Sequence, residues 1–267
     1  MKKFLMIGAI LTLLILPLSQ AVAADRITCW FPPAWGSKTG QAQQITAALS
    51  HETGFDIQAR VAKNYPEILS AFATRDENLV YVGSFVQSII KARQLGKQLV
   101  QVDNGKERYS GILIYPEGQD PQKILRDFPA EIAYAIGASS GESTAKAATG
   151  GKAAIGSANH GAACAAVNAG KARAAVVKNW WWEANKARFA GLTAYDIPRF
   201  SKQGNPDNIL TASTSVPLEK QRLITAAAMK NPQVFGGEKV HIFEDNSLQF
   251  SLWLMQQGNI DPLTYSW

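Results

Sequence analysis

Small hydroxyl-bearing and glycine residues gather at two points in the middle of the chain. Ser139, Ser140 and Gly141 follow one apolar stretch. His160 follows a second apolar stretch. At the start of a helix, the first backbone N–H groups are unpaired and the helix dipole has its positive end. Residues at such a position can therefore bind a small oxyanion. Glu142, three residues after Ser139, also fits an ordinary capping box, so spacing alone leaves both interpretations open.

The N-terminal segment has the order of a secretory signal peptide. Lys2 and Lys3 precede an apolar run from Phe4 to Leu18, and small residues follow up to Ala23. This order predicts a signal peptide over residues 1–23 and a periplasmic mature protein. No later segment approaches the roughly 20 apolar residues that a membrane span requires.

The two cysteines and the net charge of the chain limit the functions that the protein can have. An oxidising compartment permits a disulfide between Cys29 and Cys164, but their apolar surroundings favour two buried thiols, and the pairing is left open. Without Lys2 and Lys3, the formal net charge falls from +6 to +4. This mild excess, without a basic run, favours small anions and argues against nucleic acid.

Apolar runs typical of strands alternate with helical patterns, which predicts an α/β fold with mostly parallel sheets flanked by helices. The alternation restarts after Pro116, which predicts a second lobe inserted into the first. We expect lobe 1 over residues 24–111 and 208–267, and lobe 2 over residues 112–207. The expected strands are 27–31, 56–61, 79–82, 99–102, 109–115, 132–136, 153–155, 172–177 and 209–212. The expected helices are 41–51, 65–74, 88–95, 161–169, 218–229 and 248–257, with one more after Pro116.

In open parallel sheets, ligands bind beyond the carboxyl ends of the strands. The turns expected at those ends concentrate the small, hydroxyl-bearing and aromatic residues of the chain. A cleft between the two lobes is therefore the expected binding site. The candidate residues in these turns include Trp35, Tyr65, Ser84, Ser139, Ser140, Gly141, His160 and Asn179.

Four segments, in chain order, resemble the periplasmic binding proteins of phosphonate, phosphite and phosphate ABC importers, which have the type II binding-protein fold. They are the tyrosine-led segment 63–72, the turn 82–85, the segment 128–141 with its serine turn, and the segment 160–172 that begins with a histidine. The resemblance implies hinge closure around a small oxyanion and delivery to an ABC permease in the inner membrane. It also implies ligand contacts from Tyr65, Ser139, Ser140 and His160.

Two departures from the family pattern bear on the ligand. Gln87 stands where a second tyrosine is common, and Lys178-Asn179 stand where an acidic residue usually follows the strand. The loss of that carboxylate implies a ligand without a cationic tail. Gln87 and Asn179 join the candidate ligand contacts, whereas Glu142 is assigned to a capping box because it would repel an anion.

Three adjacent tryptophans, Trp180, Trp181 and Trp182, cannot all face one core. We expect at least one to reach the cleft or the surface between the lobes. The alternative is that two pack on the sheet and the third is half exposed.

An enzyme would need a nucleophile with a base, or a set of metal ligands. The histidines His51, His160 and His241 are scattered, and no catalytic or metal motif surrounds them. We therefore expect a monomeric binding protein without catalytic activity, metal or cofactor. The alternatives are a ligand sensor that docks on a membrane histidine kinase and a protein that binds a different organic anion. The sequence leaves open whether the ligand is phosphite, phosphate or an alkylphosphonate.

Overall fold

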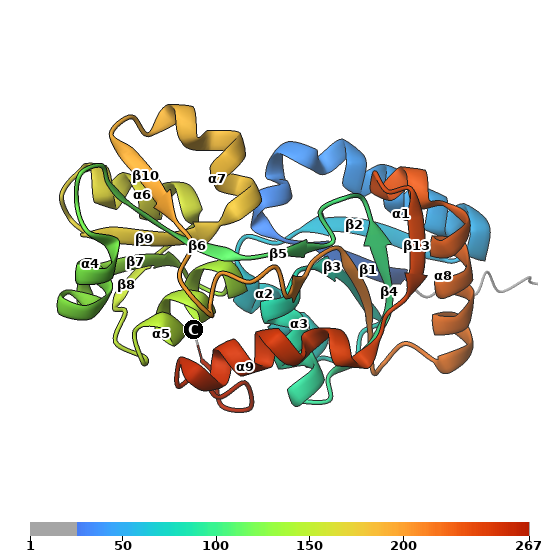
Figure 1. The fold of residues 1–267 in the computed structure, drawn as a ribbon. Helices are drawn as coiled ribbons and strands as arrows, with labels where there is room; N and C mark the ends of the chain where they lie inside the picture. The colour runs from blue at the N-terminus through green and yellow to red at the C-terminus, as the bar shows by residue number, and fades with distance from the viewer. Residues whose placement is uncertain (1–25, 267) are drawn as a thin grey trace, which may run out of the picture.

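The computed structural model describes residues 26–266, and the side chain of Ser139 lies outside this description. The predicted signal peptide, residues 1–23, also lies outside the described residues. The described chain forms two sheets that lie side by side, each with helices on both faces (Figure 1). We call the larger sheet and its helices lobe 1, and the smaller sheet and its helices lobe 2.

Lobe 1 contains a six-stranded sheet in the order β13-β4-β12-β3-β1-β2. Parallel pairing joins β1 to β2 and β3, whereas β12 runs antiparallel to β3 and β4, and β13 runs antiparallel to β4. The expected mostly parallel sheet is therefore mixed. Its strands are β1 (Arg26–Phe31), β2 (Asp56–Val61), β3 (Asn78–Val82), β4 (Gly96–Asp103), β12 (Ile209–Ser213) and β13 (Lys239–Ile242).

Five helices cover the two faces of the lobe 1 sheet. On one face, α1 (Thr39–Thr53) and α8 (Leu218–Lys230) pack on a core that includes Phe31, Leu79 and Leu210. On the other face lie α2 (Tyr65–Phe72), α3 (Ser84–Ala92) and α9 (Gln249–Gln257). Large apolar side chains fill both layers, so the lobe 1 sheet is a rigid base for the turns at its edge.

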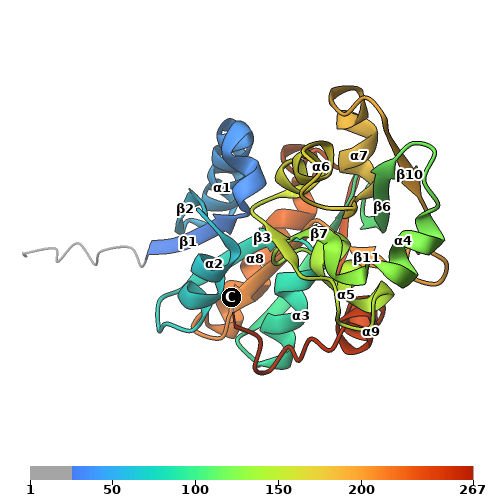
Figure 2. The same cartoon turned by 90° about the vertical axis from the view of Figure 1, so that its left-hand side faces the viewer.

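Lobe 2 contains a five-stranded sheet in the order β10-β6-β9-β7-β8. This sheet is also mixed, because β6 runs antiparallel to both β9 and β10. Its strands are β6 (Gly111–Pro116), β7 (Ile132–Ala135), β8 (Ile155–Ser157), β9 (Ala174–Lys178) and β10 (Leu192–Tyr195). Its helices are α4 (Pro121–Asp127), α5 (Thr144–Ala148), α6 (His160–Asn168) and α7 (Asn179–Asn185). Figure 2 shows lobe 2 facing the viewer, with α4 and α5 below α6 and α7.

Several helices begin where local chemistry favours a start. The side chain of Asn64 accepts a hydrogen bond from the Glu67 amide before α2, and Asn159 accepts one from the Ala162 amide before α6. Asp120 caps α4 in the same way. No side chain caps α3, which begins after Gly83. The remaining short helical turns are Pro33–Lys38, Pro129–Glu131, Ser139–Ser143, Lys186–Arg188, Pro232–Phe235 and Asp245–Leu248.

Two chain crossings and the C-terminal segment connect the lobes. The strands β5 (Arg108–Tyr109) and β11 (Asn205–Pro206) pair antiparallel as a two-stranded ribbon at the crossing. After α9, the Tyr265 hydroxyl donates to the Glu142 carboxylate of lobe 2 over 2.5 Å. The crossing ribbon and the C-terminal segment thus both lie at the seam between the lobes.

The cysteines are free thiols in different lobes. Cys29 is buried in the lobe 1 core and Cys164 in the lobe 2 core. Burial raises the pKa of both thiols, to about 12 for Cys164. The interpretation of both as buried hydrophobic residues is therefore confirmed. Among residues 26–266, no helix has the length and apolar character needed to cross a bilayer.

Candidate ligand-binding cleft

A salt bridge between Lys178 and Asp207 marks the centre of the seam. Lys178 ends β9 of lobe 2, and Asp207 lies between β11 and β12, where the chain returns to lobe 1. Both side chains are mostly buried, at 23% and 20% exposure. The Lys178 ammonium also lies 4.2 Å from the centre of the Tyr109 ring. A carboxylate and an aromatic face therefore fix this ammonium between the lobes.

The lobe 1 side of the seam presents the starts of α2 and α3. Ser84, the first residue of α3, has its hydroxyl oxygen 2.9 Å from that of Tyr109. A Cβ atom at Gly83 would lie 2.8 Å from an Asp207 carboxylate oxygen, so the glycine allows this carboxylate to approach the start of α3. Burial and the nearby Asp207 raise the pKa of Tyr65 to about 12, so its hydroxyl is a protonated donor at neutral pH.

The lobe 2 side of the seam presents His160 at the start of α6. Its Nδ1 atom is buried and has no hydrogen-bond partner among the described residues. Its ring centre lies 5.7 Å from that of Trp181. Burial and the Lys178 charge lower the pKa of His160 to about 3, so the ring is neutral at physiological pH.

The serine turn forms one π-helical turn, Ser139–Ser143, over the end of β7. Ser140 is 2% exposed. A Cβ atom at Gly141 would lie 2.8 Å from the carbonyl oxygen of Ala135, so only glycine permits this close packing. The turn is therefore held tightly against the sheet.

The described residues show only the Glu142 side of the predicted capping box, because the side chain of Ser139 lies outside the description. The Glu142 carboxylate accepts from the Gly137 amide over 2.9 Å and from the Lys146 ammonium over 2.7 Å, in addition to Tyr265. Glu142 is 2% exposed, and these three donors compensate its charge. These bonds tie the serine turn to α5 and to the C-terminal segment.

Gln87 and Asn179 already use their amide groups inside the protein. Gln87 is fully buried, and its side-chain oxygen accepts from Thr211 over 2.6 Å while its nitrogen donates to the Ile209 carbonyl over 3.2 Å. Asn179 is bonded to Ser110 twice, through its backbone N–H and its side-chain oxygen. The structure therefore places Gln87 in the lobe 1 core and Asn179 against the crossing chain, and neither joins the Lys178–Asp207 cluster.

The tryptophans take different positions. Trp35 packs on the rings of Phe31 and Tyr81 at 4.9 and 5.5 Å, over the edge of the lobe 1 core. Trp180 donates its indole N–H to the Arg108 carbonyl of the crossing strand over 3.0 Å. Trp182 is buried in lobe 2. Trp181 also packs against the lobe 2 core, so two of the three adjacent tryptophans pack in lobe 2 and Trp180 is partly exposed at the crossing strand. Whether Trp180 faces the cleft stays a prediction.

Sequence reasoning missed Asp207 and Tyr109. Both lie in the short crossing segments, and their role depends on the pairing of β5 with β11. Asp207 lies in the two-residue connection between β11, which ends at Pro206, and β12, which begins at Ile209. An acidic side chain at a predicted lobe crossing is the signal that could have identified it.

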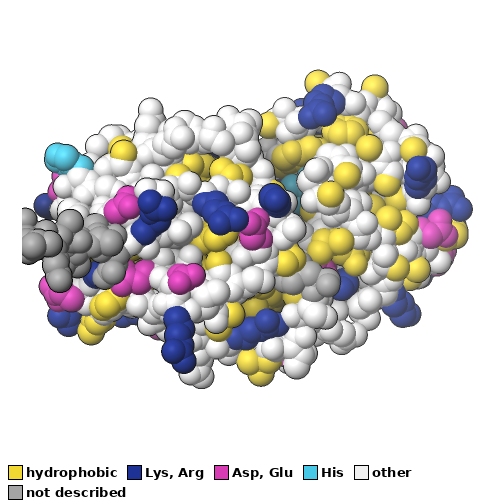
Figure 3. Space-filling view, turned by 180° about the vertical axis from the view of Figure 1, so that it is seen from behind, with side chains coloured by type: hydrophobic (Ala, Val, Ile, Leu, Met, Phe, Trp, Pro, Cys, Tyr) yellow, Lys and Arg dark blue, Asp and Glu magenta, His cyan; other side chains and the backbone are white. Residues whose placement is uncertain are grey.

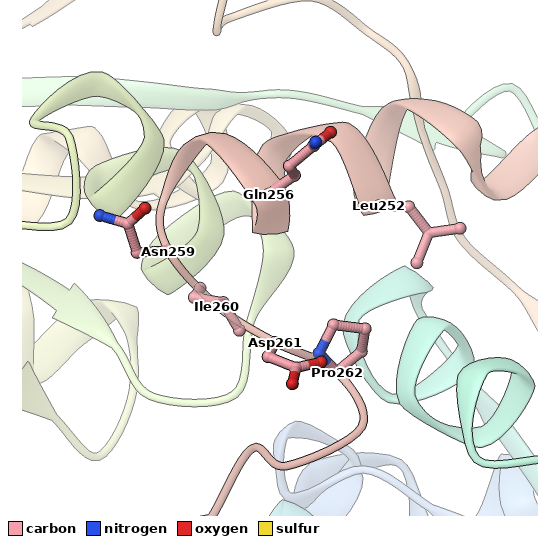
Figure 4. Close-up of a pocket in the computed structure, with 6 residues that line it drawn as sticks. All are labelled: Leu252, Gln256, Asn259, Ile260, Asp261 and Pro262. Atoms are coloured by element: carbon pink, nitrogen blue, oxygen red, sulfur yellow. The ribbon is translucent and has the colours of Figure 1, made fainter.

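Two surface cavities lie outside this cluster. One, of about 380 Å³, lies beside α9 and the segment that follows it (Figure 4). There, Asp261 already accepts from Leu263 and Thr264. The other, of about 330 Å³, is bordered by Asn179, Glu183 and Asp196 of lobe 2. Carboxylates at both sites make them poor receptors for an oxyanion.

Two α/β lobes, joined by a paired crossing and with helix starts facing the seam, define the class of two-lobed solute-binding proteins. The chain belongs to the family described as the periplasmic substrate-binding protein of phosphonate ABC transporters, because the sequence profile of that family matches residues 38–191. A search of curated proteins finds no matching sequence. Members of this family bind a small ligand and serve a membrane permease, and they are not enzymes.

Solved structures share the fold at low sequence identity. The chain is similar to PhnD1 of Prochlorococcus marinus in complex with methylphosphonate, with 14% identity, a TM-score of 0.67, and coverage of 88% of this chain and 99% of that one. It is also similar to a phosphonate-transporter binding protein of Pseudomonas aeruginosa, with 15% identity, a TM-score of 0.63, and coverage of 87% and 88%. A Xanthomonas citri protein bound to ATP has 9% identity, a TM-score of 0.68, and coverage of 88% and 97%. The type II binding-protein fold predicted from the sequence is confirmed.

Proposed function

We propose that the protein captures a small phosphorus oxyanion without a cationic tail, at the seam between its lobes, and releases it to a permease. The observation that supports this most directly is the cluster around Lys178 and Asp207. Tyr65 at the start of α2 and Gly83 before α3 lie near Asp207. His160 at the start of α6 lies near Lys178. A ligand in this position contacts both lobes at once and therefore favours the closed arrangement.

The donors at this cluster match the needs of a tetrahedral anion. The protonated hydroxyl of Tyr65 and the neutral ring of His160 can both donate to anionic oxygens. The buried Nδ1 of His160 has no partner in the described chain, and burying a polar atom unpaired is unfavourable. A ligand oxygen at this position would remove that cost. We assign Ser84 and the serine turn, Ser139 to Gly141, to the same pocket.

The remaining candidates have supporting roles in this proposal. Asn179 holds the crossing chain at Ser110, and Trp35 covers the edge of lobe 1. We infer that the protein acts as a monomer and does not bind nucleic acid. On the rear face, basic and acidic side chains are interspersed over lobe 1, while apolar side chains predominate over lobe 2 (Figure 3). Such a surface lacks the basic stripe typical of nucleic-acid binding.

A thermal-shift screen tests the proposal. The purified protein is heated with phosphate, phosphite, methylphosphonate, 2-aminoethylphosphonate or sulfate. A ligand present at 100 times its dissociation constant adds about 2.7 kcal/mol of stability, or a shift of about 5–10 °C for a chain of this size. We expect this shift with a tail-less phosphorus anion. If none of these anions raises the melting temperature, the proposed ligand class is contradicted.

A further inference from the structure

We propose that Lys178 determines ligand specificity by occupying the carboxylate of Asp207, so that the cleft rejects ligands that carry their own ammonium group. The inference rests on the proposed function, since it concerns which phosphorus oxyanions the same cleft accepts. It assigns to one salt bridge the choice between tail-less and amino-substituted ligands.

The position of the pair supports this role. Lys178 reaches the seam from lobe 2, and Asp207 from the crossing segment, so their salt bridge lies where the lobes meet. The Tyr109 ring lies against the ammonium at 4.2 Å, and the Tyr109 hydroxyl is bonded to Ser84 at the start of α3. The ammonium is thus fixed beside the helix start that we assign to the oxyanion.

The charges of the pair explain the selection. Asp207 without a partner would repel an oxyanion at the start of α3, and Lys178 cancels that repulsion. To bind Asp207, a ligand ammonium would have to displace the Lys178 ammonium. The two cations would then lie close together in a mostly buried space. A ligand without an ammonium leaves the salt bridge intact. The pair therefore favours the tail-less anion and penalises the amino-substituted one.

Side chains packed around Lys178 limit where a displaced ammonium could go. Tyr109 covers one side, and Lys178 is close enough to His160 to lower its pKa. No carboxylate other than Asp207 forms a salt bridge with Lys178 in the described chain. Displacement would consequently leave the lysine without a compensating charge.

Calorimetric titration of Lys178→Ala with methylphosphonate and 2-aminoethylphosphonate tests the proposal. The variant frees the Asp207 carboxylate, so we expect methylphosphonate to bind at least 10-fold more weakly and 2-aminoethylphosphonate to bind more tightly. The ratio of the two dissociation constants should change by at least 100-fold. Lys171→Ala, at an exposed lysine of the same lobe, should keep the wild-type ratio.

Two further variants make the outcome decisive. Lys178→Met retains the aliphatic stem over Tyr109, so it replaces the alanine variant if that protein does not fold. Adding Asp207→Asn to either variant removes the unpaired carboxylate and should abolish the new preference for 2-aminoethylphosphonate. An unchanged ratio in folded Lys178 variants overturns the specificity role, provided wild type binds methylphosphonate. If wild type binds neither compound nor phosphate, the proposed function itself fails.

Discussion

The two lobes prepare their sides of the seam differently. On the lobe 1 side, Ser84 is bonded to Tyr109, and Gln87 behind it is bonded to two strands. On the lobe 2 side, the buried Nδ1 of His160 has no hydrogen-bond partner within the part of the chain that the structure describes. The polar groups of lobe 1 at the seam are therefore bonded to one another, whereas lobe 2 presents one buried ring nitrogen without a described partner.

The cores of the two lobes differ in a related way. Phenylalanine and branched aliphatic residues predominate in lobe 1, whereas alanines such as Ala133, Ala163 and Ala175 occupy much of the lobe 2 core. Small side chains let backbone segments approach closely. A Cβ atom at Gly111 would lie 2.6 Å from the Ser140 carbonyl oxygen. Lobe 2 thus positions its serine turn by close backbone packing.

Replacing Gln87 should have the largest effect on stability. In Gln87→Leu, the Thr211 hydroxyl loses its partner inside the core, and the Gln98 amide keeps only the Gln87 backbone carbonyl. Leaving such groups unsatisfied costs about 3 kcal/mol of unfolding free energy in total. Urea denaturation measures this loss, with Gln44→Leu at an exposed position of α1 as the control. A Gln87 variant that is fully stable but binds ligand poorly would show that Gln87 belongs to the site.

Replacing Gly141 tests the close packing of lobe 2. In Gly141→Ala, the added Cβ meets the oxygen and nitrogen of Ala135 at 2.8 and 2.9 Å. Neither backbone atom can move freely, so we expect a loss of about 2 kcal/mol in stability together with weaker ligand binding. Gly36→Ala is the matched control, because no atom lies within 4 Å of the added carbon. Equal stability of the two variants in urea would contradict the packing argument.

The partly buried ring of His160 predicts that the stability of the protein depends on pH. Histidine in an unfolded chain titrates near 6.5, whereas burial and Lys178 hold the folded pKa of His160 at about 3. The unfolded state therefore takes up a proton first, and this contribution is lost as the pH falls from about 6.5 towards 3. Between pH 7 and pH 5, the loss is about 2 kcal/mol. Urea denaturation at both pH values should show this loss in wild type and a smaller one in His160→Asn; equal losses would refute it.

The smallest expected effect concerns the contact between the C-terminal segment and lobe 2. In Tyr265→Phe, the ring keeps its contact with Phe85 at 5.2 Å, but Glu142 loses one of its donors. Gly137 and Lys146 still compensate the carboxylate, so the loss should be about 1 kcal/mol. Thermal unfolding measures it. A loss as large as that of Gln87→Leu would mean that this contact joins the lobes more strongly than we infer.

The local pattern of apolar and polar residues in the sequence predicted many of the helices and strands. The strand Asp56–Val61 was predicted with its observed bounds, and the helix that starts at Leu218 was predicted to within one residue of its end. Short edge strands such as β10 and β13 were missed, because brief, half-polar segments have a weak period-two pattern. The mixed sheets were missed because alternation of strands and helices does not specify the direction of strands that return across the lobes.

The site was harder to predict than the fold. The helix expected from Ser88 begins at Ser84, and this earlier start places Gln87 on its buried face. The Lys178–Asp207 pair joins residues far apart in sequence, and their meeting depends on how the lobes cross. Tyr65 and His160 were predicted from a family pattern, and whether they contact ligand stays a prediction.

Titration calorimetry with methylphosphonate, on wild type and on one variant from each lobe, tests the central claim most directly. Tyr65→Phe and His160→Leu each remove one proposed donor to the anion, and each should weaken binding by about 1–3 kcal/mol, roughly 5- to 150-fold. Both variants should remain folded in the same thermal assay. Unchanged affinity in both variants would show that the ligand does not bind between the lobes.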